Sequence, residues 1–204
     1  GSGTHRQTAV SVFHCQPWLP VQRCMLSVSA HIDGPTQVSW TGGDAVVETL
    51  VTLGVDRVFG IPGNHNLPIY HALRRKDVNL CHVTARHEQG VGFMAEGFAR
   101  ATGRVGVALV ITGPGLTNVL TPMASALHDS IPMLVISAQV PDPWLQRPAR
   151  GYLHYLNNST AVAASASKAS FRIEDTSEIS RMLTEAYQLA LSGRPGPVHV
   201  EIAP

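Results

Sequence analysis

The sequence predicts an α/β fold, a three-layer doubly wound domain with a mainly parallel sheet and helices on both faces. Short apolar runs alternate with segments of helical periodicity, at a spacing of about 25 residues per strand–helix unit. The run at 105–111 is almost continuously apolar, which is typical of a parallel strand buried on both sides. Right-handed crossovers between such strands place helices on both faces of the sheet.

The elements follow in order from residue 43. Residues 43–53 carry a helical stripe of apolar side chains, which Gly54 closes as a C-terminal cap. We expect strands at 56–60, 79–84, 105–111, 132–137 and 197–202, and helices near 66–75, 88–102, 115–127 and 176–192.

The stretch 141–170 contains Pro143 and Pro148 and then a Ser/Ala-rich run, so we expect a long irregular connection, followed by a short strand near 169–173. Cys81 falls inside an expected strand, where a small buried thiol is the usual environment.

Residues 1–40 differ in composition from the remainder of the chain. No acidic residue precedes Asp33, and Gly1-Ser2-Gly3 resembles the remnant of a tag. An acid-poor start is also typical of a transit peptide, but two arginines and no clear amphipathic period argue against one. We therefore expect a poorly ordered N-terminal extension at 1–40 and one folded domain at 41–204.

Composition excludes several classes of function. A formal net charge of +1 gives no electrostatic case for nucleic acid or for a membrane surface. No apolar run approaches the ~20 residues that a membrane-spanning helix needs, and a cytoplasmic location is expected. Cys15, Cys24 and Cys81 have no C-x-x-C spacing, and the ten histidines follow no ligand motif, so no protein-only metal site is expected. The low charged content, 14%, suggests that a partner domain or subunit covers part of the surface.

Glu88 is the first candidate for chemistry. It follows the expected strand at 79–84 and precedes the small residues Gly90, Gly92 and Ala95, which allow a flat ligand or another backbone to come close. A carboxylate in such a place is either neutralised by a partner or has its pKa raised by desolvation, and both situations suit proton transfer. The alternative is an ordinary helix start, where acidic residues are favoured.

Two loops follow other strands at the same expected edge of the sheet. Residues 59–70 contain a Gly-Ile-Pro-Gly turn at 60–63, and residues 112–118 read Thr-Gly-Pro-Gly-Leu-Thr-Asn. The carboxyl edge of an open parallel sheet is where ligands bind. Neither loop has the G-x-G-x-x-G or G-x-x-x-x-G-K-[ST] pattern, and this disfavours a nucleotide-binding function.

Six motifs in one order resemble the pyrimidine-binding (N-terminal) domain of thiamine-diphosphate enzymes related to acetolactate synthase, pyruvate oxidase and benzoylformate decarboxylase. The resemblance covers residues from about 41 to 204 and is nearest to a branch with acetolactate-synthase-like proteins and 5-guanidino-2-oxopentanoate decarboxylase. Residues 150–154 resemble the decarboxylases. The six motifs lie at 60–63, 86–90, 95–100, 112–118, 129–132 and 192–198.

The resemblance implies a role for each matching position. Glu88 corresponds to the glutamate that hydrogen-bonds the aminopyrimidine of thiamine diphosphate and thereby promotes loss of the cofactor's C2 proton. The rival carboxylate, Glu96, lies about two helical turns further on and matches a structural position. Pro62 corresponds to a residue beside the thiazolium.

Four further positions take their candidate roles from the same resemblance. Asn64 and His65 stand where many acetolactate synthases have other residues, so one of them is expected to touch substrate; a solvated loop histidine is the alternative for His65. Thr112 and Asn118 are expected to shape the pyrimidine pocket, although Asn118 also suits a turn or cap. Gln139 matches a glutamine near the active centre.

The implied cofactors are thiamine diphosphate and Mg²⁺, with the Mg²⁺ held by a C-terminal pyrophosphate-binding domain or subunit whose motif is absent from this sequence. We therefore expect a fragment or one subunit of a split enzyme, a homo-oligomer acting on a small 2-oxo acid, and no activity of the chain alone. Whether the reaction is acetolactate synthesis or decarboxylation stays open. The alternative is a catalytically idle domain that serves as a binding or regulatory module. An adjacent reading frame that encodes the pyrophosphate-binding motif would argue against this alternative.

Overall fold

The fold is built on a six-stranded, all-parallel sheet. The computed structural model describes residues 40–75, 78–139 and 153–203, and the predicted extension at 1–40 lies almost wholly outside these ranges. The strand order is β2-β1-β3-β4-β6-β5. The strands are β1 (Arg57–Gly60), β2 (Cys81–Thr84), β3 (Gly106–Ile111), β4 (Met133–Ala138), β5 (Ala169–Ile173) and β6 (Pro197–Ile202).

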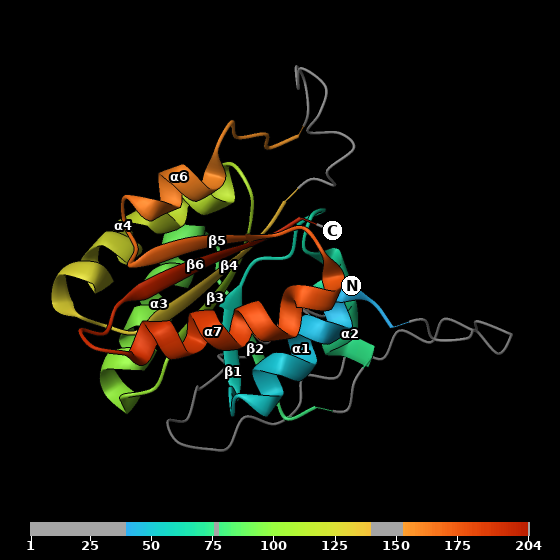
Figure 1. Ribbon diagram of the computed structural model, residues 1–204, viewed down its shortest axis with the longest axis horizontal. Coiled ribbons are helices and arrows are strands. Elements are labelled where there is room, and N and C mark those ends of the chain that lie inside the picture. The colour runs from blue at the N-terminus through green and yellow to red at the C-terminus, as the bar shows by residue number, and fades with distance from the viewer. Residues whose placement is uncertain (1–39, 76–77, 140–152, 204) are drawn as a thin grey trace, which may run out of the picture. The chain divides into compact units, whose positions relative to one another are not determined.

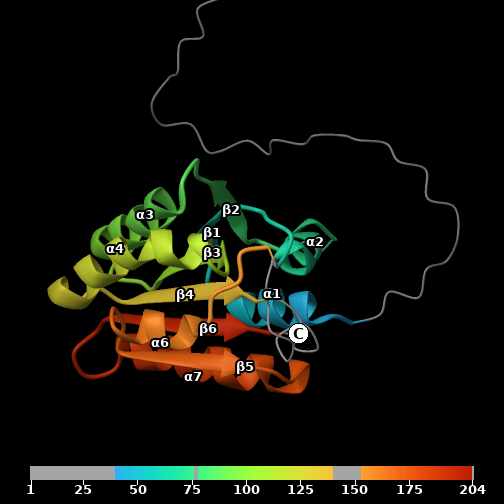
Figure 2. The same ribbon diagram turned by 90° about the horizontal axis from the view of Figure 1, so that it is seen from above.

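Helices cover both faces of this sheet, as predicted (Figure 1). Helices α1, α2 and α7 share one apolar core with the strands, and α3, α4 and α6 share the other. In Figure 2 β4, β6 and β5 run side by side in the same direction. The helices are α1 (Gly42–Thr52), α2 (Leu67–Arg75), α3 (Glu88–Thr102), α4 (Pro114–Asp129), α6 (Ser159–Ala164), the 3₁₀ turn η1 (Thr176–Glu178) and α7 (Ile179–Leu191).

Local sequence signals explain where the helices begin and end. Thr41 and Asp44 form a capping box at the start of α1. The Arg75 guanidinium, which bonds Asp44, lowers the pKa of that carboxyl to about 2. Gly103 ends α3 with a left-handed backbone at φ 69°, and Pro114 provides a pre-organised first turn for α4.

Helix α3 lies in close contact with its neighbours at two glycines, which lack a Cβ atom. A Cβ on Gly92 would lie 2.2 Å from Pro122 of α4, and a Cβ on Gly106 of β3 would lie 2.0 Å from the carbonyl oxygen of Ala95. No other residue type fits these contacts without moving a backbone. The two glycines therefore set the separation between α3, α4 and the sheet.

Strand β6 carries two fully buried polar side chains, His199 and Glu201. The His199 ring hydrogen-bonds Ser137 Oγ at 2.8 Å and Ser170 Oγ at 2.7 Å, one on each neighbouring strand. The Arg172 guanidinium on β5 donates to Glu201 Oε1 at 2.6 Å. Both buried groups thus have partners, as buried polar groups require.

The structure departs from the expected elements at two places. The described part of the stretch 141–170 contains a helix, α6, whose six residues are too few and too rich in Ala and Ser to show an apolar period. The prediction of a buried Cys81 is wrong: this free thiol is exposed, because β2 is an edge strand whose first residue has no second neighbour. Among the described residues, no helix combines the length and apolar character needed to span a membrane.

The buried histidine predicts how stability depends on pH. Burial lowers the pKa of His199 from 6.5 to about 3, so between these values the unfolded chain binds a proton that the folded chain does not. Between pH 6.5 and about 3, His199 should therefore contribute a fall in the free energy of unfolding of about 1.4 kcal/mol for each pH unit of acidification. Denaturant titrations of the 204-residue chain and of His199→Gln at several pH values measure this slope.

Substitution of an exposed histidine, His71→Gln on α2, is the matched control and should keep the wild-type slope. Equal slopes for wild type and His199→Gln would contradict the burial of a neutral imidazole at this position.

Candidate active site

All six strands end at the same edge of the sheet, and the chain reverses its direction of winding there. From β1 the chain moves outward to β2, and then returns to place β3 on the other side of β1. Ligands bind at such a switch point, beyond the carboxyl ends of the strands. The loops that follow β1, β2 and β3 meet at this edge and carry five of the seven predicted site residues, Pro62, Asn64, His65, Glu88 and Thr112.

Glu88 is the first residue of α3 and is half-buried. The His87 side chain caps the helix by accepting from the amide of Gln89 at 3.1 Å. Glu88 Oε2 accepts a hydrogen bond from Asn118 Nδ2 at 3.0 Å, so the starts of α3 and α4 are joined through these two side chains. The other oxygen, Oε1, lies 3.7 Å from the position that a Cβ on Gly115 would take, and it has no hydrogen-bond partner among the described residues.

Thr112 and Gly113 form the turn between β3 and α4. Thr112 is fully buried, and its hydroxyl has no hydrogen-bond partner in the described part of the chain. Gly113 has φ 61°, and a Cβ there would lie 2.2 Å from the carbonyl oxygen of His154. The segment that contains His154 therefore rests directly on this turn.

The loop after β1 is held by Asn66, which is fully buried. Its side chain accepts from the amide of Gly63 at 2.8 Å and donates to the carbonyl of Ile61 at 3.1 Å. Pro62 and Asn64, which lie between these anchors, are exposed and available to a ligand.

His65 is not a freely solvated loop histidine. Its ring lies edge-on to that of His154, with centroids 6.1 Å apart. Burial, and then the neighbouring His154, lower the pKa of His65.

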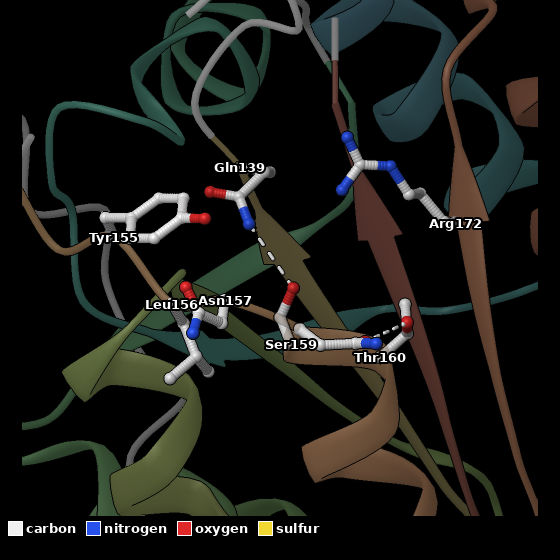
Figure 3. Close-up of a pocket in the computed structure, with 8 residues that line it drawn as sticks. Gln139, Tyr155, Leu156, Asn157, Ser159, Thr160 and Arg172 are labelled. Carbon is white, nitrogen blue, oxygen red and sulfur yellow. Dashed lines mark hydrogen bonds between the residues drawn. The ribbon is translucent and has the colours of Figure 1, made fainter. Parts of the chain in front are cut away.

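Gln139 lies apart from the other predicted site residues. It follows β4, and its amide donates to Ser159 Oγ and to Glu201 Oε2, each at 3.3 Å. It lines a cavity of about 320 Å³ that none of the other six residues lines. Figure 3 shows Gln139 and Tyr155 pointing toward one another across this cavity, with Arg172 on its far side.

Glu96 is placed as a structural residue. It is 4% exposed, accepts from Arg100 on its own helix, and accepts from Ser125 Oγ of α4 at 2.8 Å. A carboxylate whose oxygen is used in this way holds α3 against α4 and does not face the switch point.

The geometry thus joins Glu88 to Asn118 and places Thr112 and His65 at the same edge, whereas Gln139 lines a different cavity. The sequence did not single out three residues of these regions: Asn66 and His154 at the edge that carries His65 and Thr112, and Glu201 beside Gln139. Glu201 carried a usable signal, since a carboxylate inside an apolar strand needs a partner. No group of three or more His, Cys, Asp or Glu side chains able to hold a metal occurs among the described residues.

Comparison with known proteins gives consistent matches. Residues 40–164 match the family model described as thiamine pyrophosphate enzyme, N-terminal TPP binding domain. The acetolactate synthase large subunit of Lactococcus lactis is 40% identical over 162 residues, which are 79% of this chain and 27% of that protein. The mitochondrial acetolactate synthase catalytic subunit of Saccharomyces cerevisiae is 42% identical over 165 residues, 81% of this chain and 23% of that protein.

A Pseudomonas aeruginosa protein described as probable 2-ketoarginine decarboxylase is 42% identical over 166 residues, 81% of this chain and 29% of that protein. The chain therefore spans about a quarter of the length of the curated relatives it matches, between 23% and 29%.

The contact between Gly113 and His154 predicts an unequal response to two glycine substitutions. Gly103→Ala adds a Cβ at a left-handed position that faces open space, and should cost about 1–2 kcal/mol of stability. Gly113→Ala adds a Cβ at φ 61° and ψ −121°, a conformation more strained than that of Gly103, and also meets the His154 carbonyl, so its loss should be larger by about 1–3 kcal/mol. Denaturant unfolding of both variants measures the difference, and equal losses would contradict the packing of His154 on this turn.

Proposed function

The chain belongs to the thiamine pyrophosphate enzymes, of which it contains the N-terminal TPP binding domain, and we propose that it supplies the glutamate that activates the cofactor in a 2-oxo acid synthase or decarboxylase. The observation that carries this proposal is the position of Glu88. One of its oxygens is held by Asn118 at the sheet's switch point, and the other has no hydrogen-bond partner among the described residues.

The residues at this edge suit an aminopyrimidine ring. Glycine at 115 allows the start of α4 to pack directly against Ile111 and beside Glu88 Oε1, since a Cβ there would lie only 2.7 Å from Ile111. The buried hydroxyl of Thr112 has no partner in the described part of the chain and can bond a polar atom of a ligand. Thiamine diphosphate would thus be held on its pyrimidine side by Glu88, Thr112 and Asn118, and on its thiazolium side by the exposed Pro62.

Thiamine diphosphate, when bound, supplies the electron sink for carbanion chemistry, while the protein supplies position and electrostatics. Glu88 serves as the proton-holding group at the pyrimidine ring, through Oε1. Asn118 fixes the orientation of the carboxyl group by donating to Oε2, so that the proton is exchanged at one oxygen in one direction.

Two observations indicate the class of substrate: the descriptions of the related proteins and the residues of the loop after β1. A protein related to acetolactate synthases and to a 2-ketoarginine decarboxylase is expected to act on a small 2-oxo acid. Asn64 and His65 are the candidate substrate contacts on this loop. Gln139 is a weaker candidate for a substrate contact, because its amide group already donates hydrogen bonds to Ser159 and Glu201.

A complete enzyme needs partners beyond these residues. We propose that Mg²⁺ and the pyrophosphate are bound by a C-terminal domain or subunit, and that the assembly is a homo-oligomer. The relatives, of which the matched segments form 23% to 29%, are long enough to include such a domain.

Substitution of Glu88 tests the proposal. In a chimera, residues 40–204 replace the matching segment of the Lactococcus lactis large subunit, so that a pyrophosphate-binding part is present. Glu88→Gln keeps the size and hydrogen-bonding reach of the side chain but removes its acid–base function. Exchange of the cofactor's C2 proton, followed by NMR, should slow on the order of 10²–10⁴-fold, and turnover should slow with it.

Glu96→Gln in the same chimera is the matched control, because Glu96 bonds Arg100 and Ser125 away from the switch point. It should lower thermal stability and leave C2 exchange close to that of the unsubstituted chimera. Unchanged exchange in Glu88→Gln would show that this carboxylate is not the activating group and would favour an idle domain.

A second prediction concerns cofactor affinity. Because the described residues contain no cluster able to hold Mg²⁺, the 204-residue chain alone should bind thiamine diphosphate weakly, with little response to Mg²⁺. Calorimetry with and without Mg²⁺ checks this. Tight, Mg²⁺-dependent binding would overturn the assignment of the pyrophosphate site to another domain.

A further inference from the structure

Three buried polar atoms at the switch point have no hydrogen-bond partner among the described residues. They are Nδ1 of His65, Nδ1 of His154 and the hydroxyl oxygen of Thr112. A buried polar atom without a partner costs about 1–3 kcal/mol, so three at one edge of a sheet call for an explanation. The proposed function uses Thr112 for the cofactor and leaves the two imidazoles without a ligand.

The contacts around these imidazoles bring residues that are distant in sequence to one place. The two rings lie edge-on, with centroids 6.1 Å apart. The His154 backbone is seated on Gly113, next to Thr112. His65 lines a cavity of about 60 Å³ together with Ala138, whose carbonyl accepts from the amide of Thr112 at 2.9 Å. The pair therefore lies over the carboxyl ends of β3 and β4.

The backbone of His154 is itself unusual. This residue has φ 60°, a left-handed conformation that is uncommon outside glycine, although asparagine, aspartate and histidine adopt it more often than other residues. Such conformations persist where the surrounding structure holds them, and they cluster at ligand-binding sites. Here the close contact with Gly113 holds the His154 ring beside His65.

No carboxylate among the described residues occupies the unpartnered nitrogens of the pair. Neither imidazole forms an ion pair with a carboxylate of the described residues. Burial, and then the neighbouring His154, lower the pKa of His65. A negatively charged group beside both rings would accept hydrogen bonds from the two unpartnered nitrogens.

We propose that His65 and His154 together bind the carboxylate of the 2-oxo acid substrate, with each ring donating to one carboxylate oxygen. This inference rests on the proposed function for the identity of the substrate, and it adds His154 as a substrate-binding residue. A carboxylate suits the pair because its two oxygens can each accept a charge-assisted hydrogen bond. The pair is thus the part of the site that distinguishes an acid from its uncharged analogues.

The test uses NMR of the histidine rings in the 204-residue chain, titrated with pyruvate as the simplest 2-oxo acid. The ring signals of His65 and His154 should shift together and saturate, whereas those of the exposed His71 and His128 should not follow this curve. Methyl pyruvate, which keeps the keto group but has no charge, should produce no saturating shift. A lack of response to pyruvate, or an equal response to methyl pyruvate, would overturn the proposal.

His154→Asn separates binding from folding, because asparagine tolerates the left-handed backbone at this position. It should raise the pyruvate concentration needed for half of the His65 shift by about 10-fold, the effect of losing one charge-assisted hydrogen bond. The matched variant His128→Asn should leave this concentration unchanged. An unchanged His65 titration in a folded His154→Asn chain would remove His154 from the site.

The outcome is separable from that of the proposed function. If C2 exchange in the chimera depends on Glu88 but the histidine rings ignore pyruvate, the carboxylate site alone is wrong. If the rings respond while exchange is independent of Glu88, the anion site stands and the assignment of Glu88 is wrong.

Discussion

The close approach of α3 to α4 and to β3 is the constraint on which the site depends. Two glycines, Gly92 and Gly106, leave no space between the helix and its neighbours, and a methyl group at either position would overlap main-chain or proline atoms. This fixes the separation of the two helix starts. The hydrogen bond between Glu88 and Asn118 then follows from rigid packing and not from a mobile loop.

The opposite half of the sheet is organised by polar groups in a dry interior. His199 joins β4 and β5 to β6 through two serines, and Glu201 joins β5 to β6 through Arg172. Burial raises the pKa of Glu201, while the Arg172 guanidinium opposes that effect. These side-chain bonds add to the parallel backbone pairing of the three strands and satisfy polar groups that the sheet buries. Arg172 also lines the cavity that Gln139 and Tyr155 line (Figure 3).

The sequence was most informative where a local pattern determines the structure. Apolar periodicity predicted the strands around β3 and the helix that begins at Glu88, and the resemblance to thiamine-diphosphate enzymes agrees with the family match. Helix α6 was missed because six residues rich in Ala and Ser carry no period. The exposure of Cys81 depends on β2 being at the edge, which is a property of strand order. The meeting of His65 with His154 could not be read from sequence either, because it depends on the tertiary contact at Gly113.

The place of β2 at the edge of the sheet has a consequence for local opening. This four-residue strand pairs with β1 alone, so its backbone amides should exchange with solvent sooner than those of the central strands. Glu88, which follows the loop after β2, is nevertheless held in place by its own helix, because the buried residues Val91, Gly92 and Ala95 anchor the first turns of α3 in the core. The edge strand can therefore separate from β1 for short periods while Glu88 keeps its contact with Asn118.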